Sequence, residues 1–475
     1  MSVPLSLAMY ALLLVFFVLA WVKSSSARAV ATPLLLFGTF EIVSVWPAMI
    51  YAQVAAGPVH GAYPALVAGL AFTALLLGFV VAMAAGRHSP EQTAVFRDAP
   101  VRLAHPAWTY LLAIVATACV LAGLGFYLYR GLPPLVEALL VLRQGANGLD
   151  QAISIVAAGR EELTKGHYLG GAYRGQGLIL GLMQIGWPYL AALALLLFCV
   201  TRRSFWLVVA VPLLVAMLFF IAGSGQRWQV LEALLTVAVT LSLAVRVTAR
   251  WGAAVLITML AVYLGMSVLN SNYQGIGKLD DPVEAFATLA ASRIALSNGT
   301  NNVEAINFVE DGSLEPGLGT IHLQKFVDSI PGVGKSDVPF SARLALLRDP
   351  GRAQSDSTWA SQTYLGWLYV DLGLPGVVAV YLLIGALLAL AQQWLFTRPK
   401  GLLGLPAAGF VLYFLGELSL DGPATVIAFL VVVGAFYVAL RACAGLVRAP
   451  RLRPVMQSRR HGVTRGGPLT IGSGG

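Results

Sequence analysis

The chain has 475 residues, of which 58% are hydrophobic and only 11% are charged, whereas a soluble domain typically has about 25% charged residues. This composition excludes an ordinary soluble protein and predicts an integral membrane protein. The formal net charge of +9 does not favour nucleic-acid binding, because the arginines stand in expected membrane loops and in the C-terminal tail.

Apolar runs of about 17 residues or more recur along the whole chain, each long enough to cross a hydrocarbon core of roughly 30 Å as an α-helix. The first run has no basic leading segment or small-residue cleavage site, so it is interpreted as a retained helix. The runs lie at residues 4–22, 33–52, 64–85, 107–129, 177–200, 204–222, 230–245, 251–269, 374–395, 402–420 and 424–441. They predict an all-α, polytopic membrane protein with about 11 transmembrane helices.

Basic residues predict the orientation of these helices. If the C-terminus lies in the cytoplasm, every inner connection carries Lys or Arg, whereas the short outer connections at 53–63 and 421–423 carry none. The positive-inside rule therefore favours a cytoplasmic C-terminus and an outer N-terminus. We expect a single integral membrane domain at residues 1–447, followed by a disordered, basic cytoplasmic tail at 448–475.

Two outer segments, 130–176 and 270–360, are too long to be simple connections, and long loops often carry function. Apolar residues recur in the second segment at helical spacing, which predicts short amphipathic helices on the membrane face. These residues are Val303, Ile306 and Phe308 in one stretch, and Ile321, Phe326 and Ile330 in another.

Ionisable residues inside a membrane are costly unless they face a cavity or a partner. Most of those in this chain are expected at one depth, the outer edge: Arg227, Glu232, Asp371, Glu417 and Asp421. Glu41 is expected near mid-membrane as a packing residue. Arg227 stands in the turn GSGQRWQ at 223–229, where its guanidinium could bind either a lipid phosphate or the phosphate of a substrate.

The stretch QTYLGWLYVDLGLPGVV at 362–378 opens one of the most apolar segments. If residues 358–373 form a helix along the membrane surface, Tyr364, Leu368 and Asp371 share one face, and Pro375 ends the helix before the crossing begins. Aromatic residues such as Trp367 favour the membrane interface, and aromatic rings also stack on sugars.

The pattern G-x-L-Y-x-x-x-G-x-x-G, formed here by Gly366, Leu368, Tyr369, Gly373 and Gly376, resembles the O-antigen and oligosaccharide repeat-unit polymerases of the Wzy type. The turn AGSGQR at 222–227 and the segment GLGTIHLQKFVDSIPG at 317–332 are also similar to that family, and the resemblance covers residues 220–395. Where the family often has an acidic residue after the first glycine of the pattern, this chain has Trp367, and Asp371 would take over that role.

The resemblance implies a metal-independent glycosyltransferase without a cofactor in a bacterial inner membrane. It would polymerise undecaprenyl-diphosphate-linked oligosaccharide repeat units into O-antigen or a related surface polysaccharide at the periplasmic face. A flippase and a chain-length-determining co-polymerase are the implied protein partners. The chemistry needs cations near the departing diphosphate and a base near the attacking hydroxyl.

Candidate residues follow from these roles. The expected catalytic residues are Arg227 and Arg293 as cations, Asp371 as the base and Glu417 as the alternative base. The expected substrate-binding residues are Arg160, Arg174, His322, Lys325, Arg343, Arg348, Tyr364, Trp367 and Tyr369.

Two other functions stay open on the sequence alone. An O-antigen ligase or another lipid-linked glycan transferase has the same layout of helices. A transporter or flippase of lipid-linked oligosaccharide is less favoured, because transporters gather polar residues near the midplane. Nucleotide binding is not favoured, because PGVGKS at 331–336 has Ser329 where a phosphate-binding loop needs its first glycine. The chain's three cysteines are not paired at metal-ligand spacing, which argues against zinc and disulfides.

Overall fold

The computed structural model covers the membrane helices more fully than the outer segments. The residues it describes are 2–25, 31–55, 58–86, 93, 95–96, 98–102, 107–130, 132–143, 151–152, 154–156, 176–223, 227–245, 257, 299–328, 344, 347 and 363–446. The predicted run at 251–269 lies outside them, apart from Ile257, and so does the tail at 448–475.

Helices make up the architecture of the described part of the chain, as predicted, and a parallel bridge joins Arg102 to Gly401. The first helices are α1 (Val3–Ser25), α2 (Pro33–Ser44), α3 (Trp46–Ala55), α4 (Pro58–Ala85), α6 (Ala107–Arg130) and α7 (Pro134–Leu142). The central helices are α9 (Gln176–Thr201), α10 (Ser204–Gly223), α11 (Arg227–Ala244), α14 (Gly299–Glu310) and α15 (Thr320–Asp328). The last are α17 (Tyr364–Phe396), α18 (Gly404–Asp421) and α19 (Pro423–Leu446).

Six helical segments in the described residues are long and apolar enough to cross a membrane. They are Val3–Ser24, Pro33–Val54, Gly61–Ala85, Met183–Thr201, Tyr364–Phe396 and Pro423–Cys443. Shorter apolar helices span Ile114–Gly125, Ser204–Phe219 and Trp228–Ala244. The chain is therefore an all-α protein with the helices of a multi-pass membrane protein, and the expected number of crossings stays a prediction.

One predicted crossing, the run at 33–52, is interrupted, and the predicted crossing at 374–395 begins directly after a break. The run at 33–52 forms α2 and α3, which meet at Val45, and Pro47 stands in the first turn of α3, where its missing N–H costs nothing. Helix α17 is interrupted at Gly373, whose φ of 65° lies in the left-handed region that glycine tolerates. The break therefore falls at Gly373, and Pro375 lies in the first turn of the second helical segment rather than ending the first.

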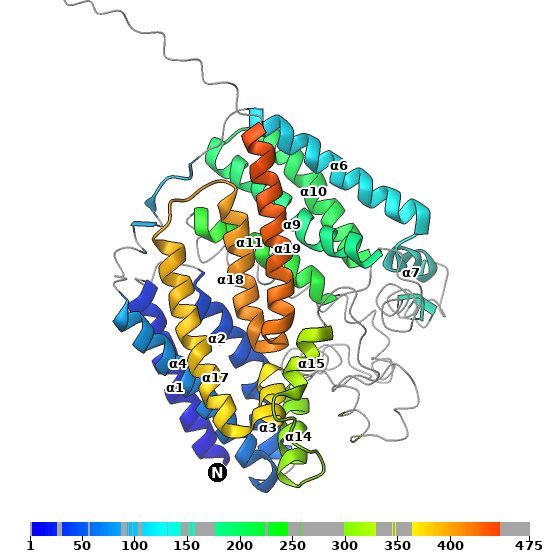
Figure 1. The fold of residues 1–475 in the computed structure, drawn as a ribbon. Helices are drawn as coiled ribbons and strands as arrows, with labels where there is room; N and C mark the ends of the chain where they lie inside the picture. Colours follow the sequence, from blue (N-terminus) through cyan, green and yellow to red (C-terminus); the bar gives the residue numbers. More distant parts are fainter. Residues whose placement is uncertain are drawn as a thin grey trace, which may run out of the picture.

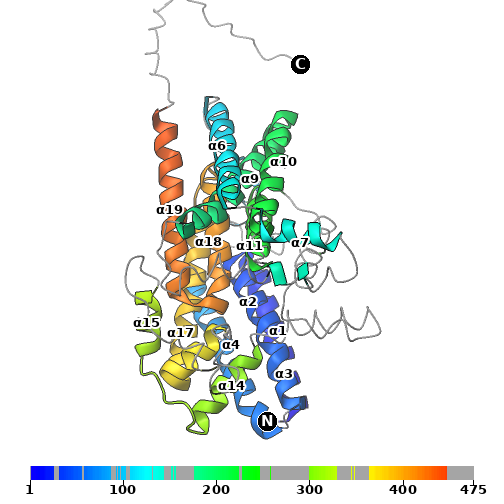
Figure 2. The same cartoon turned by 90° about the vertical axis from the view of Figure 1, so that its right-hand side faces the viewer.

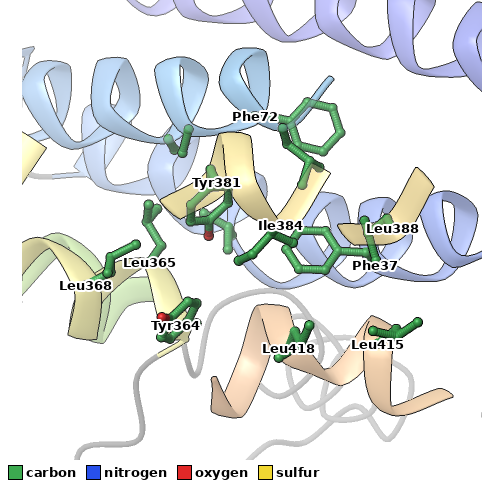
Figure 3. Close-up of a cluster of buried hydrophobic side chains, with 14 of the residues drawn as sticks. Phe37, Phe72, Tyr364, Leu365, Leu368, Tyr381, Ile384, Leu388, Leu415 and Leu418 are labelled. Carbon is green, nitrogen blue, oxygen red and sulfur yellow. The ribbon is translucent and has the colours of Figure 1, made fainter. Parts of the chain in front are cut away.

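Close packing holds the central helices together, because lipid is as apolar as leucine and exclusion of water does not drive helices together in a membrane. Helices α4 and α17 make the most extensive contact among the described helices, and both present glycine in it. A side chain at Gly78 would collide with the carbonyl of Leu382, and one at Gly385 with the carbonyl of Leu75. Figure 3 shows part of the core that surrounds this contact, with Tyr381 among apolar side chains of α2, α4, α17 and α18.

Helices α14 and α15 lie together at one end of the bundle, at the start of α17 (Figure 1). The C-terminal end of α19 lies at the opposite end in both views (Figures 1 and 2). Val303 and Ile306 of α14 are buried, and Ile321 of α15 packs against the small cluster that includes Val370. The two amphipathic helices predicted in the second outer segment are thus present as helices. Which side of the membrane they face stays a prediction.

Candidate functional site

Asp371 and His322 form the most densely bonded polar contact at this end of the bundle. The Asp371 carboxylate is fully buried in the first half of α17. Its Oδ1 accepts hydrogen bonds from the backbone N–H groups of Gly319 at 2.8 Å and Ile321 at 3.2 Å. Its Oδ2 accepts from the backbone N–H of His322 at 3.0 Å and lies 2.5 Å from His322 Nδ1. A carboxylate from one helix therefore caps the N-terminus of another, where the helix dipole favours negative charge.

The sequence GLG at 317–319 explains how α15 begins so close to α17. Leu318 and Gly319 have positive φ values of 50° and 91°, which turn the chain back toward α17. The N–H of Gly317 donates to the carbonyl of Val370 at 3.0 Å. A side chain at Gly317 would collide with Asp371 Oδ1, so only glycine lets the turn approach the carboxylate.

His322 is left with one ring nitrogen available. Because a carboxylate can only accept, Nδ1 carries the proton that points to Asp371. Nε2 has no hydrogen-bond partner within the described part of the chain, and the side chain is 25% exposed. The ring also stands edge-on to Tyr364, with centroids 5.4 Å apart. This geometry leaves Nε2 as the ring nitrogen without a partner among the described residues.

A cavity of about 340 Å³ lies beside His322. It is enclosed by α15, by the start of α17 and by the turn from α18 to α19, and its size falls within the range for small-ligand sites, roughly 300–1,000 Å³. The residues that line it include His322, Lys325, Phe326, Tyr364, Trp367, Gly422 and Ile427. Most of the wall is apolar, and its polar residues include His322, Lys325 and Asp421.

Lys325 brings a cation to the cavity. Its Nζ donates to the backbone carbonyl of Asp421 at 2.5 Å and lies 4.5 Å from the centroid of the Trp367 ring. Burial lowers the pKa of Lys325, and the carboxylate of Asp421 acts in the opposite direction. The ammonium is thus held between an aromatic face and the end of α18, at the edge of the cavity.

Tyr369 and Glu417 do not line this cavity. The Tyr369 hydroxyl donates to Glu310 Oε1 at 2.5 Å and lies 2.9 Å from the hydroxyl of Tyr63, so it joins α17 to α14 and α4. Glu417 is buried in α18 and accepts a hydrogen bond from Trp228 Nε1 at 3.0 Å. Their predicted roles, substrate binding and alternative base, stay predictions.

Other expected residues fall where the structure gives no side-chain position. Arg160, Arg174, Arg293, Arg343 and Arg348 lie outside the described residues. Arg227 is the first residue of α11, but its side chain is not described. Within the described ranges, no group of three or more His, Cys, Asp or Glu side chains is placed to hold a metal ion.

The cavity therefore gathers His322, Lys325, Tyr364 and Trp367, with Asp371 directly behind His322. Sequence reasoning missed the turn between α18 and α19, where Gly422 and Pro423 complete the wall. The signal for it is the pair Asp421 and Gly422, because a glycine that directly follows a helix often ends it with a positive φ, here 75°.

Comparisons of the chain with protein-family models, with curated proteins and with solved structures find no match.

Proposed function

We propose that the chain is a membrane glycosyltransferase that polymerises undecaprenyl-diphosphate-linked oligosaccharide repeat units. The observation that carries the proposal is the cavity beside His322. It brings together an imidazole whose Nε2 has no hydrogen-bond partner among the described residues, a cation and aromatic rings on the two segments, 317–332 and 366–376, that resemble the polymerase family. A base, a cation and sugar-stacking surfaces are the groups that glycosyl transfer from a lipid diphosphate needs.

His322 is the base in this proposal, and Asp371 is a positioning residue. The buried carboxylate of Asp371 is already occupied by α15, whereas His322, which lines the cavity, has no hydrogen bond at Nε2 within the described part of the chain. An aspartate on Nδ1 fixes the tautomer whose Nε2 can accept a proton and stabilises the imidazolium that forms. The sequence predicted Asp371 as the base. In this proposal His322 is the base instead, and Asp371 positions it.

The reaction transfers a glycan chain from one lipid to another. The hydroxyl oxygen of the acceptor sugar attacks the anomeric carbon of the donor, and the bond from that carbon to the diphosphate oxygen breaks. The bonding electrons leave with the diphosphate, and the hydroxyl proton passes to His322 Nε2. Lys325 then stands on the side of the cavity where negative charge would develop, with Arg227 as a second proposed cation.

The mixed character of the cavity wall also supports a glycolipid substrate. Trp367 and Tyr364 offer aromatic surface for sugar rings, while Phe326 is 47% exposed and Ile427 48% exposed beside them. A lipid-linked sugar has an apolar chain, a charged diphosphate and a polar ring, in that order along the molecule. The cavity presents surfaces for each of these parts within one space.

The test is polymerisation of a lipid-linked repeat unit by the purified protein in nanodiscs, with a metal chelator present. We expect a ladder of products from the wild type and strong loss of the ladder in Arg227→Ala and Asp371→Asn. A parallel reaction with a lipid A core acceptor tests the ligase alternative. A folded wild type that extends no repeat unit, or that transfers glycan only to the lipid A core, would contradict the polymerase.

A further inference from the structure

Two stripes of polar side chains face each other between α11 and α18. Residues four positions apart lie on one face of a helix, and each helix carries polar residues at this spacing at nine-tenths burial or more. The helices pack against each other, and Trp228, one turn before Glu232, donates to Glu417. The stripes are Glu232, Thr236 and Thr240 on α11, and Tyr413 and Glu417 on α18.

Several oxygens in these stripes lack a partner. Oε1 of Glu232 and the hydroxyls of Thr236 and Thr240 have no hydrogen bond to any part of the chain that the structure describes. The hydroxyl of Ser242 on the same helix, by contrast, is satisfied by the carbonyl of Val239 at 2.7 Å. The two threonines thus leave their hydroxyls available at the interface.

Thr240 and Glu232 lie at the contact with α18. Oγ1 of Thr240 occupies the space that a side chain at Gly409 would need. Glu232 is close enough to Glu417 and Asp421 to interact electrostatically with both. Inside a bilayer, polar groups without partners are expensive and need an internal ligand. Neighbouring carboxylates further favour a positively charged ligand.

We propose that this interface binds one monovalent cation, Na⁺ or hydronium, between the carboxylates of Glu232 and Glu417. The hydroxyl of Thr236 is a further ligand, and water continues to Thr240, which lies about 12 Å along α11 from Glu232. Oxygen donors suit a hard cation. A divalent ion is not favoured, because the described residues hold no cluster of three or more metal-binding side chains. This inference does not depend on the polymerase reaction.

The charged surroundings of the proposed ion can be named. At the outer end, Asp421 faces the carboxylates and Lys325 donates to the Asp421 carbonyl. Tyr413 is the titratable neighbour on α18, and α2 contributes the apolar ring of Phe40, 6.1 Å from the ring of Tyr413. Arg227 opens α11 with a side chain outside the described residues, so a variant at that position belongs in the test.

The experiment is thermal unfolding of the purified protein, followed by tryptophan fluorescence, in sodium, potassium or choline chloride at equal ionic strength and several pH values. A bound ion stabilises only the folded state, so we expect sodium to raise the Tm over choline by on the order of 2 °C. If hydronium is the occupant, the Tm in choline rises toward acid pH instead. Glu232→Gln should abolish the dependence and Thr236→Val should reduce it. Ser242→Ala, whose hydroxyl is satisfied within α11, should keep it.

Three results would overturn the proposal. One is a wild-type Tm that is the same in all salts and at every pH. Another is a dependence that is unchanged in both Glu232→Gln and Thr236→Val. The third is a sodium effect that appears only in Arg227→Gln, because the guanidinium would then fill the site in the wild type. Polymerase activity is not measured, so failure here leaves the proposed reaction untouched.

Discussion

Asp371→Asn is the substitution that tests most sharply whether Asp371 positions His322 for catalysis or only stabilises the fold. The variant keeps the size of the side chain but replaces one carboxylate oxygen with an amide NH₂. If the remaining oxygen keeps the bonds from Gly319 and Ile321, the NH₂ faces the backbone N–H and Nδ1 of His322. Two donors then meet, and the imidazole can accept from the amide only by moving its proton to Nε2.

The geometry sets the size of both effects. Hydrogen bonds to a charged group contribute about 1.5–3 kcal/mol each. Because the moved proton lets the imidazole accept from the amide, the bond lost is the one from the His322 backbone N–H, which lowers the free energy of unfolding by about 1.5–3 kcal/mol. A proton on Nε2 removes the free base, and general bases contribute about 10²–10⁴-fold to rate. We therefore expect the initial rate of polymerisation to fall by about 10²-fold or more.

The assay measures the initial rate of ladder formation in nanodiscs at saturating lipid-linked substrate, alongside the thermal stability of each variant. Glu310→Gln is the matched control. Glu310 is a carboxylate at the same end of the bundle, but it accepts a hydrogen bond from Tyr369 and does not line the cavity. A folded Asp371→Asn protein that works within a factor of about two of the wild type would refute the reasoning, since a general base is expected to supply far more.

Three further predictions concern stability, each measured by thermal unfolding. Gly422→Ala forces a residue with φ of 75° into an unfavourable conformation and should cost about 1–2 kcal/mol. Gly434→Ala, which meets nothing within 4 Å, should not destabilise the protein. Equal stability of the two variants would contradict this prediction. Tyr381→Phe removes the hydrogen bond of 3.2 Å to buried Glu41 and should cost about 1–3 kcal/mol; an unchanged Tm would show that the bond contributes nothing. Burial lowers the pKa of Lys325, so the unfolded chain binds the proton more tightly, and stability should rise as the pH increases from the lowered pKa toward about 10.4. Lys325→Gln should flatten that rise. A pH profile of stability that is unaltered in the variant would contradict this prediction.

Hydropathy predicts the position of several helices, because a spanning segment must satisfy its backbone internally, while the number of crossings stays a prediction. The runs at 4–22, 204–222 and 402–420 correspond closely to α1, α10 and α18. Breaks are harder to place, because they depend on single backbone angles. Pro375 looked like the end of a surface helix, yet proline is tolerated in a first turn, and Gly373 makes the break.

The residue types of the site could be predicted, but not their pairing. Ionisable and aromatic residue types singled out Asp371, His322 and Trp367 in the sequence. The contact between Asp371 and His322 joins residues 49 positions apart, and it depends on how α15 packs on α17. Tyr369 was predicted as a site residue, but its partners Glu310 and Tyr63 come from α14 and α4. Neither partner stands out in the sequence.

The most direct test of the central claim is the rate of ladder formation by His322→Asn. Asparagine can keep an N–H donor toward Asp371 in place of Nδ1, while it lacks the nitrogen that faces the cavity. If His322 is the base, the folded variant loses activity by about 10²-fold or more and keeps the wild-type Tm within a few degrees. A folded His322→Asn protein that forms ladders at the wild-type rate would contradict the account.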